Sequence, residues 1–193
     1  MARIALTGEI GAGKSTAAKI LAEKLNYELF NADLIAKDLW QNENIKNKLI
    51  SHYKNFILDE NNNIDLKKLA QIIFNDNDEY KFSCKLIHPV VMSELKKISG
   101  YNSVIEIPLI FEAGFYDWVN YILYVGADFE SRLKRCEIQR GWSKNELLRR
   151  EKFLMPREER IKLSDYIIYN DGDLKDLERE ILKFIEWLNK TGK

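Results

Sequence analysis

The residues with the clearest chemical potential lie near the start of the chain. Residues 8–15 have the sequence GEIGAGKS, which fits the pattern G-x-x-x-x-G-K-[ST] at every specified position. Backbone N–H groups in such a phosphate loop point inward and attract phosphate oxygens. The Lys14 ammonium can reach the β- and γ-phosphates, and the Ser15 hydroxyl can ligate Mg²⁺. The residues expected to hold ATP phosphates are Gly11, Ala12, Gly13, Lys14, Ser15 and Thr16.

Asp33 is a candidate for the reacting end of the site, because it follows a strand-like run at 27–30. Ligand sites in open parallel sheets lie at the carboxyl ends of the strands, so Asp33 is expected to face the phosphate loop. There it could activate or position a hydroxyl that attacks the γ-phosphate. It could equally be the N-cap of a helix over 34–40, a position that aspartate favours. The residue type and position alone leave both roles open.

A second acidic candidate, Glu106, lies in the strand-like run 103–107. An acid there can hold the water shell of Mg²⁺, so the metal site is predicted at Ser15 and, through water, Glu106. The apolar residues Leu109 to Phe111 could wall a substrate pocket. Ordinary contacts at a strand end are the alternative, and Glu112 could be an acid that favours a helix start.

Arginines are concentrated after the strand-like run 121–125. Charge on a transferred phosphoryl group calls for such cations, often from a mobile lid. Arg140 is the strongest candidate, because Gly141 can supply a hinge. Most arginines on a charged helix are instead solvated or paired with glutamate, so one or two functional ones are expected. The five arginines are Arg132, Arg135, Arg140, Arg149 and Arg150.

These residues need a scaffold, and the apolar pattern predicts one. Strands are expected at 3–7, 27–30, 103–107, 121–125 and 166–169, with a helix at 14–25 after the first. The order is that of a three-layer α/β domain with a five-stranded parallel sheet. Residues 32–100 are mostly helical and too long for a simple crossover, which predicts an inserted subdomain. A closing helix at 174–188 is expected to turn five residues inward: Leu177, Ile181, Leu182, Ile185 and Leu188.

The prolines indicate further element boundaries, and the composition limits the classes of function. Pro89, Pro108 and Pro156 are each expected to mark a boundary, with His88-Pro89 closing one helix and opening the next. The 193 residues carry 30 basic and 30 acidic side chains, and this zero net charge argues against a nucleic-acid partner. No run approaches the roughly 18 apolar residues of a membrane span. A cytoplasmic protein, monomeric or weakly homo-oligomeric, with Cys84 and Cys136 as free thiols, is expected.

In their order along the chain, these residues resemble the dephospho-coenzyme A kinase family. The resemblance spans nearly the whole sequence. Residues 7–15 resemble the family's T-G-x-I-G-x-G-K-S, 31–36 its D-A-D-x-I-A, and 88–89 its H-P. Residues 107–112 resemble its x-P-L-L-F-E, and 164–172 its A-D-x-V-I-x-N-x-G.

The resemblance implies ATP-dependent phosphorylation of the ribose 3′-hydroxyl of dephospho-coenzyme A, the last step of coenzyme A synthesis. It implies that Asp33 activates this hydroxyl, so the catalytic candidates are Asp33 together with Lys14 and Arg140 from the phosphate loop and the arginine-rich region. Within one domain, 1–193, it makes 32–100 the substrate-binding insertion and 128–163 the lid. The nucleotide-binding core is then 1–31, 101–127 and 164–193. The substrate would meet Asp33, His88, Pro89, Leu109 and Phe111, and the adenine of ATP would lie near Asn170 and Gly172.

The chain departs from the family pattern at several positions. Asn31 replaces the first aspartate of D-A-D, whereas Asp33 is retained. The family spaces two lid arginines as R-x-x-x-R, but Arg135 and Arg140 lie one residue further apart, and the context of Arg140 makes it the better match. Leu154 stands where a glutamine is common.

Three other functions are weaker alternatives. A nucleoside monophosphate kinase would need clamping arginines near the second strand, but residues 31–40 contain Lys37 and no arginine. A guanine-specific switch should carry N-K-x-D after a strand, and this motif is not found. A helicase is disfavoured by zero net charge and small size.

Overall fold

The computed structural model describes residues 2–114 and 116–191. Residues 1, 115 and 192–193, which belong to the predicted core segments, lie outside the described residues. Five parallel strands form one sheet in the order β2-β3-β1-β4-β5. This confirms the predicted parallel sheet. The strands are β1 (Arg3–Gly8), β2 (Glu28–Asn31), β3 (Ser103–Glu106), β4 (Tyr121–Gly126) and β5 (Tyr166–Tyr169).

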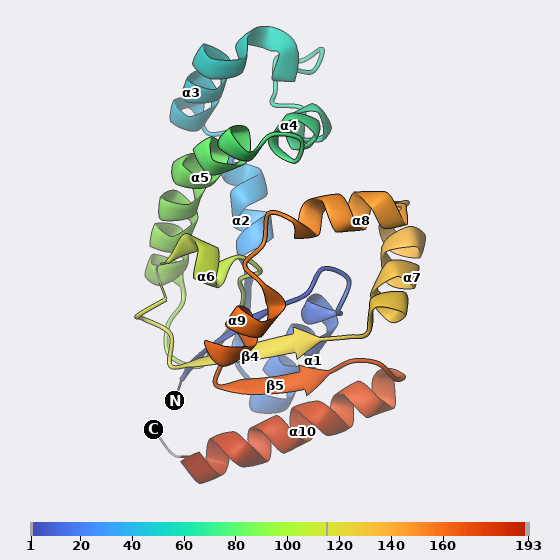
Figure 1. Ribbon diagram of the computed structural model, residues 1–193. Helices are drawn as coiled ribbons and strands as arrows, with labels where there is room; N and C mark the ends of the chain where they lie inside the picture. The colour runs from blue at the N-terminus through green and yellow to red at the C-terminus, as the bar shows by residue number, and fades with distance from the viewer. Residues whose placement is uncertain (1, 115, 192–193) are drawn as a thin grey trace.

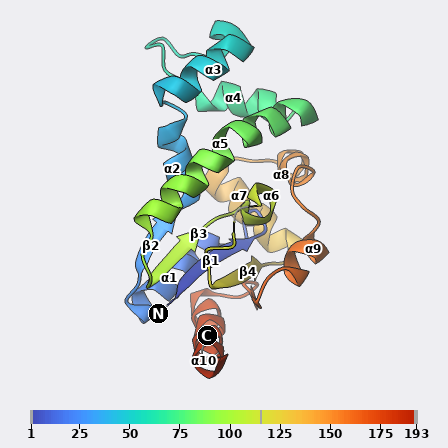
Figure 2. The same ribbon diagram turned by 90° about the vertical axis from the view of Figure 1, so that its left-hand side faces the viewer.

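Helices cover both faces of the sheet. Successive strand residues point to opposite sides, so apolar side chains on both faces have to be buried. Ile4 and Leu6 of β1 pack with α1 (Lys14–Leu25) and α10 (Leu174–Thr191). Ala5 between them belongs to a second hydrophobic cluster that includes residues of α5 (Asn77–Ile98) and α6 (Ile110–Ala113). In both ribbon views the insertion and α10 lie on opposite sides of the sheet (Figure 1, Figure 2). The three layers are therefore helix, sheet and helix, as predicted.

The segment between β2 and β3 is helical, as its apolar spacing predicts. Asp59 closes the exposed turn at 59–63 by accepting hydrogen bonds from the N–H groups of Asn61 and Asn63. The helices of this insertion, besides α5, are α2 (Ala32–Leu39), α3 (Glu43–Tyr53), the 3₁₀ helix η1 (Lys54–Ile57) and α4 (Leu66–Ile73).

The predicted helix boundary at His88-Pro89 is wrong, because α5 runs unbroken through Pro89. Proline removes one backbone donor from a helix interior and normally bends or ends it. Here Ile87, Val91 and Met92 on both sides of Pro89 are buried in the same cluster. Their shared packing keeps the two halves of α5 in one helix.

The other boundaries follow the sequence more closely. Pro108 follows β3 and Pro156 is the N-cap of α9 (Arg157–Lys162). The segment predicted as the lid, 128–163, also contains α7 (Phe129–Arg140) and α8 (Lys144–Glu151), which are separated at Gly141, whose φ of 66° lies in the left-handed region. In α10 the prediction for Leu182 is wrong: it is 45% exposed, whereas Phe184 is buried. The core face of α10 follows Leu177, Ile181 and Phe184, and Leu182 lies off this stripe.

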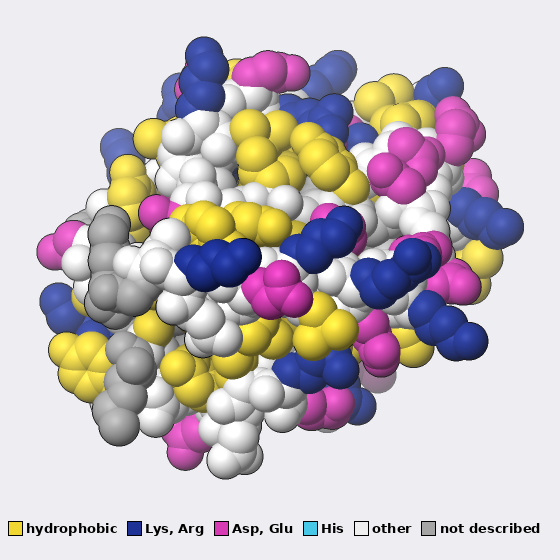
Figure 3. Space-filling model, turned by 90° about the horizontal axis from the view of Figure 1, so that it is seen from below, with side chains coloured by type: hydrophobic (Ala, Val, Ile, Leu, Met, Phe, Trp, Pro, Cys, Tyr) yellow, Lys and Arg dark blue, Asp and Glu magenta, His cyan; other side chains and the backbone are white. Residues whose placement is uncertain are grey.

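The surface beneath the sheet mixes both signs of charge with apolar side chains (Figure 3). On α10, Arg179 pairs with Asp176 and Lys183 with Glu180. Within residues 2–114 and 116–191, none of the helices combines the length and apolar character needed to cross a bilayer.

Candidate active site

The phosphate loop, residues 8–15, is shaped by glycines that no other residue could replace without strain. Gly8 has φ 142°, and an added Cβ would lie 2.0 Å from the Val125 carbonyl oxygen. Gly13 has φ 89°, and its Cβ would lie 2.4 Å from Asn170 Nδ2. Gly13 is also the N-cap of α1, and no side chain caps that helix. The N–H groups of the first turn of α1 are therefore directed to the position where a phosphate binds.

Lys14 is buried at the centre of this loop. Its ammonium donates hydrogen bonds to the carbonyl oxygens of Glu9, at 2.8 Å, and Gly8, at 3.3 Å. Burial lowers the pKa of Lys14 from 10.5 to about 8, against the opposing effect of Glu106 and Asp33. The side chain is thus a positive charge in a poorly hydrated position, where added phosphate charge is strongly attracted.

Sheet register brings Glu106 and Asn31 together. The two residues pair across β2 and β3, so their side chains share one face. Asn31 Nδ2 donates to Glu106 Oε2 at 2.7 Å, and Ser15 Oγ donates to Glu106 Oε1 at 2.9 Å. Burial raises the pKa of Glu106, while the Ser15 hydrogen bond and Lys14 act in the opposite direction. Sequence analysis predicted Ser15 and Glu106 as residues of this site. It named Asn31 only because this residue replaces the first aspartate of the family's D-A-D motif.

Asp33 does not cap a helix. The N-cap of α2 is Asn31, whose side-chain oxygen accepts a hydrogen bond from the N–H of Leu34 at 3.1 Å. The Asp33 carboxyl instead interacts electrostatically with Lys14 and Arg140, which lower its pKa. The net direction is upward: although Asp33 is an exposed residue, the protein around its carboxyl partly desolvates that group and raises its pKa. Because Asn31 is the N-cap of α2, the capping alternative for Asp33 is excluded.

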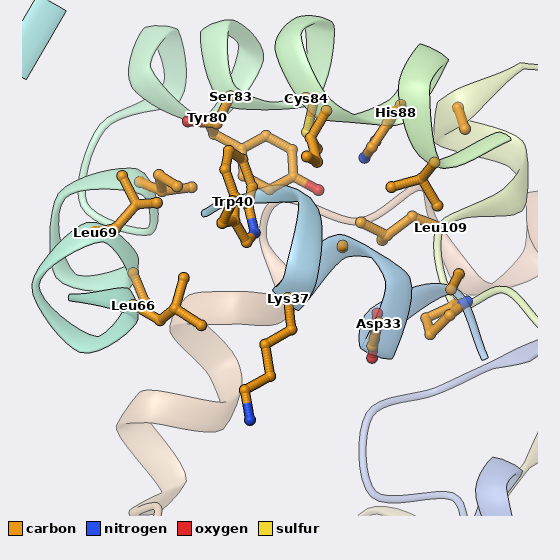
Figure 4. Close-up of a pocket in the computed structure, with 18 of the residues that line it drawn as sticks. Asp33, Lys37, Trp40, Leu66, Leu69, Tyr80, Ser83, Cys84, His88 and Leu109 are labelled. Carbon is orange, nitrogen blue, oxygen red and sulfur yellow. The ribbon is translucent and has the colours of Figure 1, made fainter. Parts of the chain in front are cut away.

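Asp33 stands at one end of an apolar groove of about 390 Å³ (Figure 4). The groove runs between α2, α4 and α5 and the segment after β3. Its wall includes Trp40, Leu66, Leu69, Phe74, Tyr80 and Cys84. Sequence analysis predicted helices in 32–100 and did not predict a groove between them.

The predicted substrate residues divide into two groups. His88 and Leu109 line the groove, and burial lowers the pKa of His88, which favours its neutral form. Pro89 is exposed on α5 and does not line the groove. Phe111 is buried in the core, with its ring 5.6 Å from that of Tyr116. The structure therefore does not bring Pro89 and Phe111 to the groove.

The arginines of the predicted lid differ sharply in their surroundings. Arg132 is only 5% exposed and pairs with Glu9 and Glu151, which ties the phosphate loop to α7 and α8. Arg135 donates to the carbonyl oxygens of Asn170, at 2.7 Å, and Gly11, at 3.4 Å. Arg140 is exposed, and its charge acts on both Lys14 and Asp33.

Asn170 belongs to the wall of the phosphate loop. It is buried, and its side-chain amide donates to the Ala12 carbonyl oxygen at 2.8 Å. Gly172 lies further along the same segment, and a Cβ there would meet the Asp176 carboxylate at 2.1 Å. Buried Arg160, which donates to the Gly8 carbonyl oxygen at 3.1 Å, was not predicted, since its sequence neighbours indicate only a charged helix.

A parallel sheet with a phosphate loop after β1, a helical insertion after β2 and an arginine-rich helical segment after β4 defines a P-loop kinase. Comparison with known proteins specifies the family. The family model described as dephospho-CoA kinase matches residues 2–176. The dephospho-CoA kinase of Fusobacterium nucleatum is 37% identical over 188 residues, covering 95% of this chain and 96% of the relative. The chain therefore belongs to the dephospho-CoA kinase family.

Solved structures agree with this assignment. A crystal structure of a Thermus thermophilus protein is 32% identical, with a TM-score of 0.76 over 97% of both chains. The dephospho-CoA kinase from Campylobacter jejuni is 26% identical, with a TM-score of 0.68 over 99% of this chain and 98% of that one. Family membership favours dephospho-CoA kinase over a nucleoside monophosphate kinase and over a nucleotide switch.

Proposed function

We propose that this chain transfers the γ-phosphoryl group of ATP to the ribose 3′-hydroxyl of dephospho-CoA, with Asp33, Lys14 and Arg140 as its catalytic residues. One observation carries the proposal. Asp33 stands between the phosphate loop and the apolar groove, and its carboxyl interacts with both Lys14 and Arg140. A hydroxyl placed at Asp33 would therefore face the position of the γ-phosphate.

The proposed reaction is a direct transfer that forms no covalent bond to the protein. The Asp33 carboxylate accepts a hydrogen bond from the 3′-hydroxyl and takes up its proton as the new O–P bond forms. The bond between the γ-phosphorus and the bridging oxygen of ATP breaks, and ADP leaves with that electron pair. Lys14 and Arg140 stabilise charge on the oxygens of the transferred group.

The surroundings of Ser15 and Glu106 fit a magnesium ion. Two oxygen atoms of the kind that Mg²⁺ prefers, Ser15 Oγ at the start of α1 and Glu106 Oε1 at the end of β3, lie 2.9 Å apart. Glu106 is buried, and Lys14 acts on its charge. Ser15 would ligate the ion directly and Glu106 would hold its water. When bound, Mg²⁺ neutralises charge on the β- and γ-phosphates.

The proposed roles are assigned to separate segments of the chain. Residues 32–100 carry the substrate groove and 128–163 form the lid. Residues 1–31, 101–127 and 164–193 form the nucleotide-binding core. Residues 11–16 would hold the phosphates, and Asn170 and Gly172 would lie near the adenine.

An acceptor-dependent assay tests this function. ADP release is measured with ATP·Mg²⁺ and dephospho-CoA, AMP, CMP or no acceptor, and product mass is recorded. We expect release with dephospho-CoA only, and a product heavier by one phosphoryl group. Release with a monophosphate would indicate a nucleotide kinase. Tight ATP binding without acceptor-dependent release would indicate a switch.

Variants of the proposed catalytic residues test the mechanism in the same assay. Asp33→Ala and Lys14→Ala are expected to lower kcat by about 100-fold or more, because each removes a proton acceptor or a charge-stabilising group. Asp38→Ala is the matched control, since Asp38 is exposed on the same helix and outside the groove. Near-normal turnover in Asp33→Ala would disprove its role.

Variants of the two proposed lid arginines, Arg135 and Arg140, are expected to change different kinetic constants. Arg140→Ala is expected to lower kcat, because Arg140 acts on the reacting groups. Arg135→Ala is expected mainly to raise the KM for ATP, because Arg135 holds carbonyl oxygens of Gly11 and Asn170. A larger kcat loss in Arg135→Ala would reverse the assignment.

A further inference from the structure

Four side chains form a stack of alternating cations and aromatic rings across the lid. The Arg140 guanidinium lies 4.7 Å from the Trp142 ring centre, and the Arg150 guanidinium lies 4.1 Å from the same ring. Arg150 is also 4.3 Å from the ring centre of Phe74. Each of these distances is within the range of a cation–π attraction. We call Arg140, Trp142, Arg150 and Phe74 the arginine–aromatic stack.

The stack joins two parts of the proposed site. Arg140 is the last residue of α7 and interacts with Lys14 and Asp33. Phe74 is the C-cap of α4 and lines the apolar groove. The two ends of the stack therefore lie at the phosphoryl-transfer position and at the wall of the acceptor groove.

The middle of the stack is held in place by its neighbours. Arg150 Nε donates to Glu146 Oε1 at 2.7 Å, one turn earlier on α8. Phe153, just beyond α8, lies 5.8 Å from Phe74 and 4.7 Å from Tyr80, measured between ring centres. These contacts dock the lid on the insertion and fix the guanidinium that supports Trp142.

Arg140 itself has no comparable anchor. Among residues 2–114 and 116–191, no hydrogen bond or ion pair holds its guanidinium, and the side chain is exposed. A free arginine side chain samples many rotamers, and ordering it costs entropy. The Trp142 ring is the contact that restricts it.

We propose that Trp142 and Arg150 are positioning residues that hold Arg140 toward the transferred phosphoryl group, with Phe74 as their anchor on the groove wall. The inference rests on the proposed function of Arg140. It adds that the orientation of Arg140 depends on aromatic contacts from the lid and, through Arg150, on the wall of the acceptor groove. Stacking on a flat ring suits the planar guanidinium better than it would suit a lysine ammonium.

Single and double variants test the stack through kcat and KM for ATP and dephospho-CoA. Trp142→Leu and Arg150→Met are each expected to lower kcat about tenfold, the size expected for one partly desolvated cation–π contact. KM values should stay within about twofold, since the stack is proposed to act on the phosphoryl group. Trp142→Phe keeps an aromatic face and should retain at least about half of the wild-type kcat. Lys48→Met, which removes an exposed cation on α3 outside the groove, is the matched control and should leave kcat unchanged.

The double variant Arg140→Ala/Trp142→Leu separates positioning from general structural support. If Trp142 acts through Arg140, the double variant is no slower than Arg140→Ala alone. A loss that multiplies on the Arg140→Ala background, or a Trp142→Phe as slow as Trp142→Leu, would overturn the proposal. So would normal turnover in Arg140→Ala. Failure of the proposed function would appear separately, as a wild-type protein that does not phosphorylate dephospho-CoA; the same series would then be measured with the acceptor that the wild type uses.

Discussion

At Lys14, the burial of a charged group opposes the stability of the fold. Lys14 is 9% exposed, and burial lowers its pKa to about 8. Below that pH the native state must keep a charge in a position that disfavours it. The unfolded chain carries the same charge in water. Retaining Lys14 therefore lowers the free energy of unfolding near neutral pH.

Replacing this lysine should stabilise the fold while it abolishes phosphoryl transfer. Lys14→Met is expected to raise the free energy of unfolding by roughly 1–2 kcal/mol at pH 7, without nucleotide. Between pH 8 and 10.5 native Lys14 loses its proton while the unfolded lysine keeps it, so wild-type stability rises and the difference shrinks. Urea unfolding at several pH values measures this. Lys19→Met, exposed on the same helix, should show no such difference; a Lys14→Met less stable than wild type would contradict the argument.

Individual residues show where sequence patterns suffice and where they fail. Gly13, Lys14 and Ser15 were predictable, because the phosphate loop requires fixed types at fixed spacing. Arg132 was not: its neighbours indicate a charged helix, whereas its buried pairing with Glu9 depends on a contact 123 positions away in the chain. Asn31 is intermediate, since N-capping by asparagine is predictable but its hydrogen bond to Glu106 follows from sheet register.

Among the elements, α5 shows how tertiary packing overrides a local signal. Pro89 lies in the interior of a 22-residue helix, where it leaves one backbone carbonyl without its usual N–H partner. The buried residues on both sides of Pro89 supply the compensating packing. Strands and helices with regular apolar spacing, such as β4 and α1, were predicted because local pattern and packing agree. The helix through Pro89 could not be predicted from the sequence, since only the tertiary packing supports it.

Removing this proline should stabilise the helix. Pro89→Ala is expected to raise the free energy of unfolding by about 1–3 kcal/mol, because it restores a backbone donor and removes the ring from the helix interior. Pro89 is exposed, so the change should leave no cavity. Chemical denaturation measures the effect, and Pro156→Ala is the control, because Pro156 is an N-cap outside the helix interior. Destabilisation by Pro89→Ala would mean that the ring has a structural role in α5.

At the scale of the whole molecule, the insertion and the core share their packing. One hydrophobic cluster extends from Ala5 and Ile105 in the sheet to Leu69 of α4 and Leu49 of α3. The other sheet face packs separately, with Leu21 of α1 in its centre. The insertion thus buries its apolar residues in continuity with the sheet, although its helices extend well away from it (Figure 1).

This continuity predicts that insertion and core unfold together. Leu49→Ala in the insertion and Leu21→Ala in the core both truncate side chains of 0% exposure and should each lower the free energy of unfolding by about 2–5 kcal/mol. Both should shift one urea transition without changing its slope, with the same midpoint by far-UV circular dichroism and tryptophan fluorescence. An early transition in Leu49→Ala alone, with the later one at the wild-type midpoint, would show an insertion that unfolds independently. The ring contact between Phe74 of α4 and Phe153 after α8 joins the insertion to the segment 128–163. An insertion that unfolds independently would lose this contact before the sheet unfolds, whereas a cooperative insertion would keep it until the whole chain unfolds.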